Sequence, residues 1–514
     1  MNLRAFFVCY CFFQICTNVC IAEIRLPSLF SDNMVLQRDK PIPVWGWAEP
    51  GEKIEVSLQK QLVKTVANQG KWMVYLPPMK AGGPYTLTIK GNNTITCNQV
   101  LIGEVWITSG QSNMEWGLFK TIGGDSAIAQ SNNEQLRIFN VPHNVKMQPD
   151  SNVNAKWVQS APATTKNLSA VAYHFLSTLQ KELNVPVGCI NVAFGGTVIE
   201  SWMSKEVLDK MPVKDKYMSL DSTKAEYDAR LLKIKPIIDA FEKAEDSAKA
   251  LRLPPPPRPT QIQSEFKGTT TIYNGELAPL IPYAVKGMVW YQGESNAYPG
   301  RANTYRQLLP AFIGMCRNKW NDVALPFIIV QISGDRLLQK DPVENSGIAV
   351  IKEAQLLTAR NTPHTALVTT HDCGELDVHY RNKQPIGKRV CQAALALAYG
   401  KPVPFTGPLF SKWRKEGDKI IISFTQIGSG LTIKTDTTKP DTLYGFAIAG
   451  KDKQFYSAKA VIRNNEVVVS SAAVPDPAAV RYAWANFSFL WNLYNKDGYP
   501  ASAFRTDDWE LSSK

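Results

Sequence analysis

The sequence predicts an α/β protein whose central sheet is doubly wound and mainly parallel, with a β-sandwich-like domain on each side. Three observations carry this prediction. Short strand-like runs between Gly and Pro turns fill residues 24–100, strands and helices alternate over residues 101–400, and β-like runs return after Gly400. Alternating strands and helices favour a parallel sheet, whereas closely spaced short strands favour sandwiches. The length of 514 residues agrees with about three domains.

Four segments are expected along the chain. They are a secretory signal peptide (1–22), an N-terminal β-domain (23–100), an α/β domain (101–400) with a helical insertion at about 205–266, and a C-terminal β-domain (401–514). The signal combines Arg4, an apolar stretch starting at Phe6 and small residues at its end. We therefore expect an exported protein, periplasmic or extracellular. The apolar stretch is too short for a membrane span, and no later segment predicts one.

The regular elements follow from local patterns. In the first β-domain, strands are expected at 44–48, 53–57, 71–75 and 85–89. In the α/β domain, strands are expected at 105–107, 187–193, 285–291, 326–332 and 365–370, and helices at 169–183, 304–320, 350–360 and 384–398. In the last domain, strands are expected at 419–423, 443–446 and 466–470. A proline run at 254–257 interrupts the charged insertion, and no internal repeat is evident.

Composition excludes several classes of function. The net charge is +12, but the basic residues are scattered among acidic ones, so nucleic acid is not expected as a partner. Four of the nine cysteines fall in the predicted signal, and the other five lack CxxC spacing and cannot all pair. Buried free thiols are therefore expected, with no metal site and no cofactor.

The most informative stretch runs from Gly103 to Trp116. The apolar run 105–107 ends at Ser109-Gly110, and Gly110 permits a sharp turn. Ser112 would then lie at the carboxyl edge of a parallel sheet, where ligands bind in such folds. A serine there can act as a nucleophile, although a serine before a helix is also a common N-cap.

Two further strands are expected to end in turns of small residues. Gly195-Gly196-Thr197 follows one strand, and Gln292-Gly293-Glu294-Ser295-Asn296 follows another. Turns of this kind let backbone N–H groups approach a ligand closely. Together with the Ser112 turn, they predict one site at one edge of one sheet.

The general base is sought among five histidines. His143, His174 and His364 lie in less suitable contexts, and a packing role is favoured for His174. His371 and His379 follow the last strand, and His379 has Asp377 two positions before it. In an extended segment both side chains would point to one face, so Asp377 could orient the imidazole. His379 is preferred over His371.

These blocks resemble SGNH-type hydrolases, and most closely the sialate O-acetylesterase family of carbohydrate esterases. The resemblance rests on Gly-Gln-Ser112-Asn-Met, Gly-Gly196-Thr-Val-Ile-Glu-Ser-Trp202, Trp-Tyr-Gln292-Gly-Glu-Ser-Asn296 and Asp377-Val-His379. The segments 26–38, 480–486, 492–495 and 500–506 also resemble that family, so the similarity covers nearly the whole mature chain.

The resemblance implies an SGNH-hydrolase-like domain between β-domains and the hydrolysis of acetyl esters on sugars. Ser112 would be the nucleophile and His379 the base, while the amides of Ser112 and Gly196 and a side chain of the third block would bind the oxyanion. Either Gln292 or Asn296 could supply that side chain, and Gln292 is preferred. The family spacing places Asp three residues before His, so Asp372 or a backbone carbonyl could replace Asp377.

The predicted function is a serine esterase acting on O-acetylated glycans. The resemblance points to 9-O-acetylated sialic acids, and acetylxylan or another hemicellulose is the alternative substrate. An alternative of a different functional class is a non-catalytic carbohydrate-binding protein that binds sugars on Trp45, Trp47 and Trp72. The alternation of these residues within strand patterns favours core positions instead. A retaining glycosidase using Glu104 and Glu294 is disfavoured, because Glu104 is expected before its strand.

Overall fold

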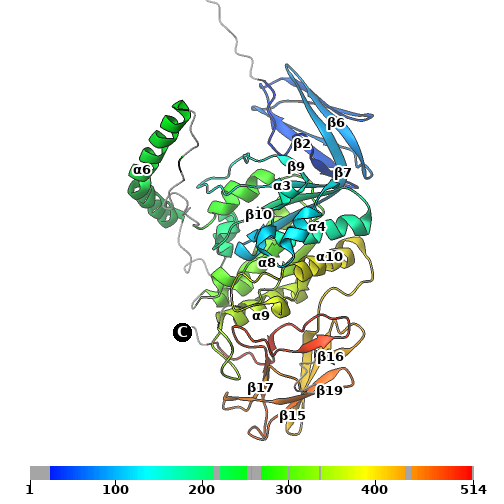
Figure 1. Cartoon of the computed structure of the whole chain (residues 1–514), viewed down its shortest axis with the longest axis vertical. Coiled ribbons are helices and arrows are strands. Elements are labelled where there is room, and N and C mark those ends of the chain that lie inside the picture. The colour runs from blue at the N-terminus through cyan, green and yellow to red at the C-terminus, as the bar shows by residue number, and fades with distance from the viewer. Residues whose placement is uncertain are drawn as a thin grey trace, which may run out of the picture.

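The protein has three parts arranged along its long axis (Figure 1). This computed structural model describes residues 23–211, 220–251, 256, 268–298, 301–334, 337–434 and 442–511. A β-rich part lies at one end, an α/β part in the middle and a second β-rich part at the other end. The mixed α/β class with a large, mostly parallel sheet is confirmed. The predicted signal peptide and most of the proline run lie outside the described residues.

The central sheet has the strand order β13-β12-β11-β7-β10-β8-β9. Adjacent strands from β13 to β8 are parallel, and β9 is antiparallel to β8. The strands are β7 (Thr94–Gly110), β8 (Asn133–Asn140), β9 (Trp157–Ser160), β10 (Val187–Ala193), β11 (Gly287–Tyr291), β12 (Phe327–Val330) and β13 (Thr365–Val368). All residues of β10, β11 and β12 are buried, which explains their nearly uninterrupted apolar sequences.

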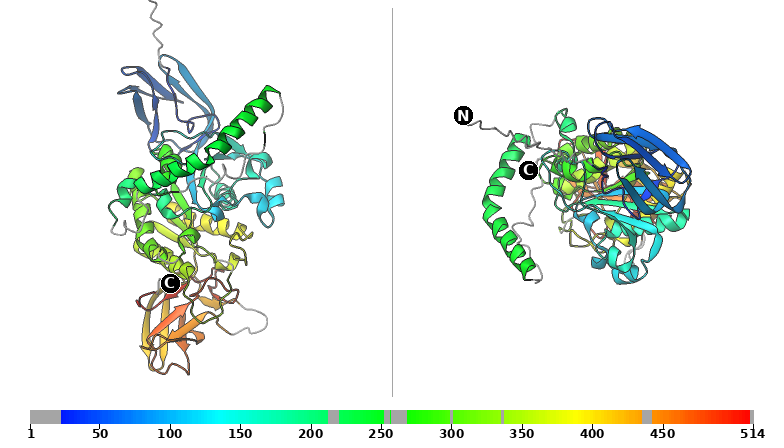
Figure 2. Two further views of the ribbon diagram at one scale, coloured as in Figure 1. Left: turned by 90° about the vertical axis from the view of Figure 1, so that its left-hand side faces the viewer. Right: turned by 90° about the horizontal axis from the view of Figure 1, so that it is seen from above.

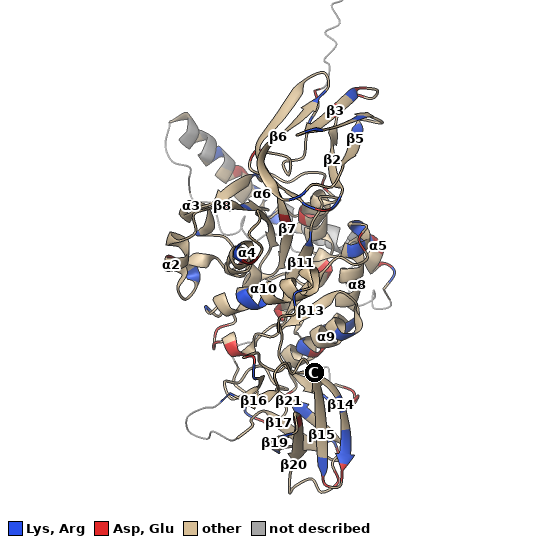
Figure 3. Cartoon of the chain, turned by 90° about the vertical axis from the view of Figure 1, so that its right-hand side faces the viewer, with Lys and Arg blue, Asp and Glu red and all other residues tan. Residues whose placement is uncertain are grey.

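Two pairs of helices cover the sheet. The helices are α4 (Ala170–Leu183), α8 (Tyr305–Lys319), α9 (Gly347–Asn361) and α10 (Gln384–Tyr399), all close to their predicted bounds. Helix α4 contacts α10, and α8 contacts α9. Figure 3 shows the two pairs on opposite sides of the strands. Because β10 and β11 flank β7 on opposite sides, the order of winding reverses at β7.

Shorter helices connect these elements. They are α1 (Ser112–Glu115), α2 (Gly124–Ala129), α3 (Pro162–Thr165) and α5 (Lys205–Leu208), with single turns at Leu118–Lys120, Ile199–Trp202, Tyr273–Leu277, Ala278–Leu280, Glu294–Asn296, Ala302–Thr304 and His371–Cys373. The predicted insertion contains the long helix α6 (Leu220–Ala250). Figure 2 shows α6 beside the body, outside the helices that cover the sheet.

The N-terminal part is built on the first half of β7. Its other strands are β1 (Val35–Gln37), β2 (Ile42–Trp47), β3 (Lys53–Leu58), β4 (Gln61–Val66), β5 (Lys71–Leu76) and β6 (Gly82–Lys90). Strand β7 pairs with β6 near its start and with β10 and β11 near its end. The boundary expected at residue 100 therefore falls inside one continuous strand of 17 residues.

The aromatic residues of the N-terminal part belong mostly to its core. Trp72 is 4% exposed, and Trp45 packs edge-on against the ring of Phe30 with 4.7 Å between centroids. Trp47 is half-buried. This burial favours the core interpretation of these tryptophans over a sugar-binding platform.

In its described residues, the C-terminal part contains two four-stranded antiparallel sheets and a strand pair. The orders are β14-β15-β20-β19, β18-β17-β21-β23 and β16-β22. The strands are β14 (Leu409–Glu416), β15 (Lys419–Thr425), β16 (Leu431–Ile433), β17 (Phe446–Ala449), β18 (Phe455–Ser457), β19 (Lys459–Arg463), β20 (Glu466–Ser470), β21 (Ala479–Tyr482), β22 (Leu493–Asn495) and β23 (Phe504–Arg505). The strand expected to start at residue 443 starts three residues later, at Phe446, because Gly445 adopts a φ of +89°, which lies outside the extended region, and β17 begins after it.

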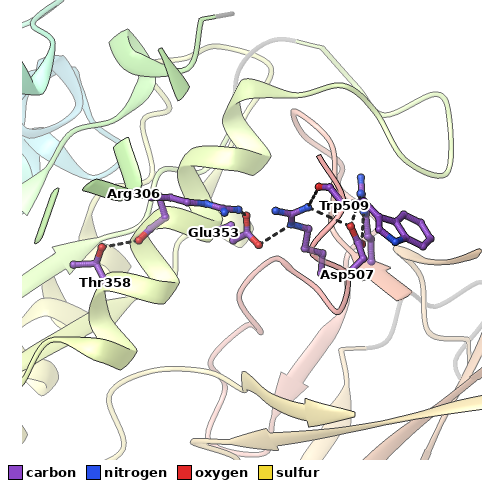
Figure 4. A network of polar contacts seen from close by, with 8 residues as sticks. Arg306, Glu353, Thr358, Asp507 and Trp509 are labelled. Carbon is purple, nitrogen blue, oxygen red and sulfur yellow. Dashed lines mark hydrogen bonds and ion pairs between the residues drawn. The ribbon is translucent and has the colours of Figure 1, made fainter. Parts of the chain in front are cut away.

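A chain of mostly buried ion pairs joins the C-terminal segment to the central part (Figure 4). Glu353 on α9 accepts hydrogen bonds from Arg306 on α8 and, at 2.9 Å, from Arg505 on β23. Asp507 then accepts from Arg505 at 3.2 Å and from Arg481 at 2.8 Å. The alternation of charges compensates the cost of burying them.

The five cysteines outside the predicted signal are all buried and unpaired, as expected. No helix among the described residues has the length and apolar character needed to cross a membrane.

Candidate active site

Three parallel strands end side by side where the winding of the sheet reverses. Gly110, the last residue of β7, is in register with Ala193, the last residue of β10, and with Tyr291, the last residue of β11. The turns after these strands therefore start at one level, at the carboxyl edge of the sheet. Open α/β sheets bind ligands at this kind of position. The expectation that three small-residue turns meet at one edge is confirmed.

The turn after β7 presents Ser112. Gly110 has a φ of +147°, and a Cβ atom there would lie 2.1 Å from the carbonyl oxygen of Tyr291, so only glycine fits. The chain turns sharply, and Ser112 becomes the first residue of α1. The N-cap of α1 is Gln111, which makes no side-chain cap bond. Ser112 is therefore not a capping residue, and its side chain remains partly exposed.

The turn after β10 lies against Ser112. A Cβ atom on Gly195 would be 3.2 Å from the Cβ of Ser112. Gly196 follows with a φ of +68°. Within the described part of the chain, the backbone N–H groups of Ser112 and Gly196 have no hydrogen-bond acceptor. Two such donors close to one serine hydroxyl are suited to a developing oxyanion.

The turn after β11 is fixed to the turn after β7. The side-chain oxygen of Gln111 accepts hydrogen bonds from the backbone N–H groups of Gly293 and Ser295, each at 3.2 Å. Gln111 is 3% exposed, so these bonds are shielded from water. They hold the third block of the motif against the Ser112 turn.

Gln292 and Asn296 are fully buried beneath that turn. The amide nitrogen of Gln292 donates to the carbonyl oxygen of Thr197 at 3.0 Å and to Oδ1 of Asn296 at 2.8 Å. The amide nitrogen of Asn296 donates to Glu200 at 2.8 Å. Since an amide NH₂ has two hydrogens, both hydrogens of Gln292 are engaged inside the protein. These two amides connect the turns after β10 and β11.

His379 lies beside the Ser112 turn. Its ring stacks on Trp116, the residue after α1, with 4.7 Å between ring centroids and 13° between planes. The side-chain amide of Asn113 donates to the carbonyl oxygen of Val378 at 3.0 Å. These two contacts join the loop that carries His379 to the turn that carries Ser112, so both residues lie at one site.

The carboxylates around His379 have different environments. Oδ1 of Asp377 accepts the backbone N–H of His379 at 2.8 Å, but it lies 3.9 Å from ring Nδ1. The segment bends instead of extending, and the Asp377 side chain is 68% exposed. Asp372 is bound by Arg389 through two 2.7 Å hydrogen bonds, and the guanidinium lowers the pKa of its carboxyl against the effect of burial. Asp372 is therefore engaged elsewhere.

Asn113 connects the site to two charged groups. It is 1% exposed, donates to Glu294 at 2.6 Å and accepts a hydrogen bond from the ammonium of Lys383. Lys383 is fully buried, with its ammonium 3.7 Å from the centroid of the Tyr380 ring. Burial lowers the pKa of Lys383 to about 7. Asn113 thus joins the Ser112 turn, the His379 loop and the start of α10.

A second histidine faces the Gly195 turn. Nε2 of His143 lies 3.0 Å from a carboxylate oxygen of Glu115, and the other oxygen of that carboxylate accepts the N–H of Gly195 at 2.7 Å. The His143 ring stacks on Phe194 with 3.7 Å between centroids. This pair fixes the turn that carries Gly196.

The other expected or excluded residues lie outside this cluster. His174 is buried in α4, and burial lowers its pKa to about 4, which fits the packing role. Glu104 lies inside β7, not before it, and is paired with Arg38. No group of three or more metal-ligating side chains occurs among the described residues.

Comparisons with known proteins agree with this geometry. A family model described as carbohydrate esterase, sialic acid-specific acetylesterase matches residues 102–236 and 260–396. The sialate O-acetylesterases of Rattus norvegicus and Homo sapiens are 29% and 28% identical, over 76% and 78% of this chain and 76% of each relative. A carbohydrate acetylesterase from Xanthomonas citri has a similar structure, with a TM-score of 0.80 and 34% identity over 95% of this chain and 100% of that one.

The chain belongs to the sialic acid-specific acetylesterase family.

As a member of the sialic acid-specific acetylesterase family, the protein is a carbohydrate ester hydrolase, which confirms the resemblance and the reaction class predicted from the motifs. The family match covers all the turns that form the cluster around Ser112. Sequence reasoning assigned no role to Asn113, Gln111 or Lys383. Asn113 and Gln111 were visible in the first motif, but only the fold shows which distant turns their side chains reach.

Proposed function

We propose that this carbohydrate esterase removes O-acetyl groups from sialic acids, with Ser112 as nucleophile and His379 as general base. The proposal rests on the cluster of Ser112, the Gly195-Gly196 turn and His379, which lies where the winding of the sheet reverses at β7. The sialic acid substrate is supported by the family match and by the names of the curated relatives. The fold is then an SGNH-type hydrolase fold, doubly wound around β7 and flanked by β-domains.

In the proposed mechanism, Oγ of Ser112 attacks the acetyl carbonyl while His379 accepts the hydroxyl proton. The oxyanion of the tetrahedral intermediate accepts hydrogen bonds from the N–H groups of Ser112 and Gly196. His379 then protonates the departing sugar oxygen, leaving an acetyl-serine ester. Water, deprotonated by the same imidazole, hydrolyses this ester and releases acetate.

The neighbouring groups hold the catalytic atoms in place. Stacking on Trp116 restricts the ring of His379, and Asp377 restrains the backbone of the same residue. Because both amide hydrogens of Gln292 are engaged and Asn296 is bound to Glu200, these residues shape the oxyanion site indirectly. Two backbone donors would then carry the stabilisation that is worth about 3–4 kcal/mol per donor in comparable sites.

The signal-like sequence of residues 1–22 supports export, so we infer that the substrate is an extracellular or periplasmic glycan. The decisive experiment measures acetate release from 9-O-acetylated sialosides and from acetylxylan by the wild type and by Ser112→Ala. We expect wild-type activity on the sialosides and a loss of about 10⁴-fold or more in the variant. Unchanged acetate release by Ser112→Ala would reject the mechanism, and activity confined to acetylxylan would reject the substrate.

A further inference from the structure

A cavity of about 250 Å³ lies between the loop after β13 and the C-terminal β-rich part. On one side it is lined by His371, Asp372 and Gly374, which precede His379 in the same loop. The other side includes Trp491, Asn492 and Tyr494 from the C-terminal part. Residues 492–495 resemble the family, yet the proposed acetyl transfer uses none of them. The volume is slightly below the ~300 Å³ at which small-molecule sites usually begin, so it suits one sugar ring better than a chain.

The C-terminal wall is rich in aromatic rings. It contains Tyr444, Phe489, Trp491 and Tyr494. The Phe489 side chain is 62% exposed although it is large and apolar. Exposed aromatic surface beside a cavity commonly marks a binding site. Aromatic faces pack against the C–H groups of a sugar ring, while polar neighbours bind its hydroxyls.

A buried histidine also lines the cavity. His371 is 6% exposed, and its Nε2 has no hydrogen-bond partner among the described residues. Its ring lies edge-on to Trp491 and Tyr494, with centroids at 5.8 and 6.3 Å. Burial lowers the pKa of His371 to about 4, so the imidazole is neutral at physiological pH. Leaving a buried nitrogen unsatisfied is costly, and a ligand hydroxyl would satisfy it.

The charged groups around the cavity leave an excess of positive charge. The carboxylate of Asp372 is compensated by the two hydrogen bonds from Arg389. Lys434 is exposed, with its ammonium 5.0 Å from the centroid of the Tyr494 ring. No other acidic residue lines the cavity within the described ranges.

We propose that this cavity is a glycan subsite that binds one carboxylate-bearing sugar ring of the substrate. The aromatic side chains pack on the ring, Nε2 of His371 accepts a hydroxyl hydrogen, and Lys434 pairs with the carboxylate. This inference rests on the proposed function, because it assigns the C-terminal part a role in holding the acetylated glycan whose ester Ser112 cleaves. The cavity wall and the catalytic base belong to the same loop, which connects the subsite to the segment that carries His379.

The binding test uses the full chain and two oligosaccharides without acetyl esters. Sialyllactose and lactose are titrated into the wild type, Phe489→Ala and Lys434→Gln, and binding is followed by ligand-observed NMR. Phe489 and Lys434 are exposed, so both variants should fold, as checked by their Tm. Tyr75→Ala and Lys71→Gln are matched controls, since both residues are exposed on β5 of the N-terminal part.

We expect sialyllactose to bind the wild type and the controls equally, and to bind each cavity variant about tenfold more weakly, corresponding to about 1.4 kcal/mol. Lactose should bind more weakly than sialyllactose. Equal binding to the cavity variants and the wild type would overturn the proposal, as would absence of sialyllactose binding to the wild type. Equal binding of the two sugars would overturn the assignment of a carboxylate-bearing ring.

A kinetic test separates this inference from the proposed mechanism. On 4-nitrophenyl acetate, which lacks a sugar, the cavity variants should keep the wild-type kcat/KM. On an acetylated sialyl oligosaccharide they should lose about tenfold in kcat/KM. Parallel losses on both substrates would overturn the subsite. By contrast, failure of the proposed mechanism would appear as acetate release by Ser112→Ala, with the binding data unaffected.

Discussion

Replacing Asn113 by alanine should destabilise the protein and slow acetate release. The change removes the donors to Glu294 and Val378 and the acceptor of the Lys383 ammonium, all in a site that is 1% exposed. A hydrogen bond to a charged group contributes about 1.5–3 kcal/mol, and an unpaired buried charge costs about 3–5 kcal/mol. We therefore expect a loss of about 4 kcal/mol, or about 6 °C in Tm for a cooperative unit of about 300 residues.

The assay combines thermal unfolding with acetate release. Since Asn113 also anchors the loop that carries His379, kcat should fall by about 10²-fold, as expected when a base is displaced by about 1 Å. Asn318→Ala, at an exposed position of α8, is the control and should behave as wild type. The double variant Asn113→Ala/Lys383→Met should recover part of the lost stability, because it also removes the stranded charge. A double variant less stable than Asn113→Ala would refute this reasoning.

Three further predictions follow from other contacts. Asp377→Asn should lower kcat/KM by less than about tenfold, because the Asp377 carboxylate lies 3.9 Å from Nδ1 of His379. Changing a buried triad carboxylate costs ~10⁴-fold, and a loss of that size would contradict the prediction. Burial lowers the pKa of Lys352 to about 7, from 10.5 in the unfolded chain, so the stability of the wild type increases as the pH rises from 7 toward 10. Lys352→Met removes the buried charge and should therefore raise Tm more at pH 6 than at pH 9. An equal gain in Tm at the two pH values would argue against this account. Glu353→Gln should lower Tm by several degrees, since Arg505 loses a buried counter-charge; an unchanged melting curve would exclude a stabilising role for the pair.

Much of the fold could be predicted from local pattern. The apolar run at 187–193 coincides with β10, and the helix from 384 coincides with α10 to within one residue, because both elements have uniform local signals. The errors occur where tertiary context decides. Strand β7 begins at Thr94, well before the apolar run, because pairing with β6 extends it. Gly445 delays β17 through a backbone conformation that an apolar pattern does not encode.

The candidate site could be predicted only as far as its turns. Ser112 and Gly196 follow strands that end in register, so topology brings their turns together. His379 lies in the loop after the edge strand β13, and its contact with Trp116 places it at the site. The partners of side chains could not be predicted, because they depend on three-dimensional packing. The expected donor Gln292 is occupied by Thr197 and Asn296, and the bend at Asp377 directs its carboxylate to the backbone of His379.

The shared strand β7 has a consequence for anyone who divides or recombines this protein. The same 17 residues bind the N-terminal sheet at one end and present Ser112 at the other. A cut or fusion at residue 100 would sever a hydrogen-bonded ladder, not a linker. Swapping the N-terminal part for that of a relative should therefore preserve enzyme function only when the graft keeps the pairing of Val100 with Tyr85 and of Leu101 with Val35.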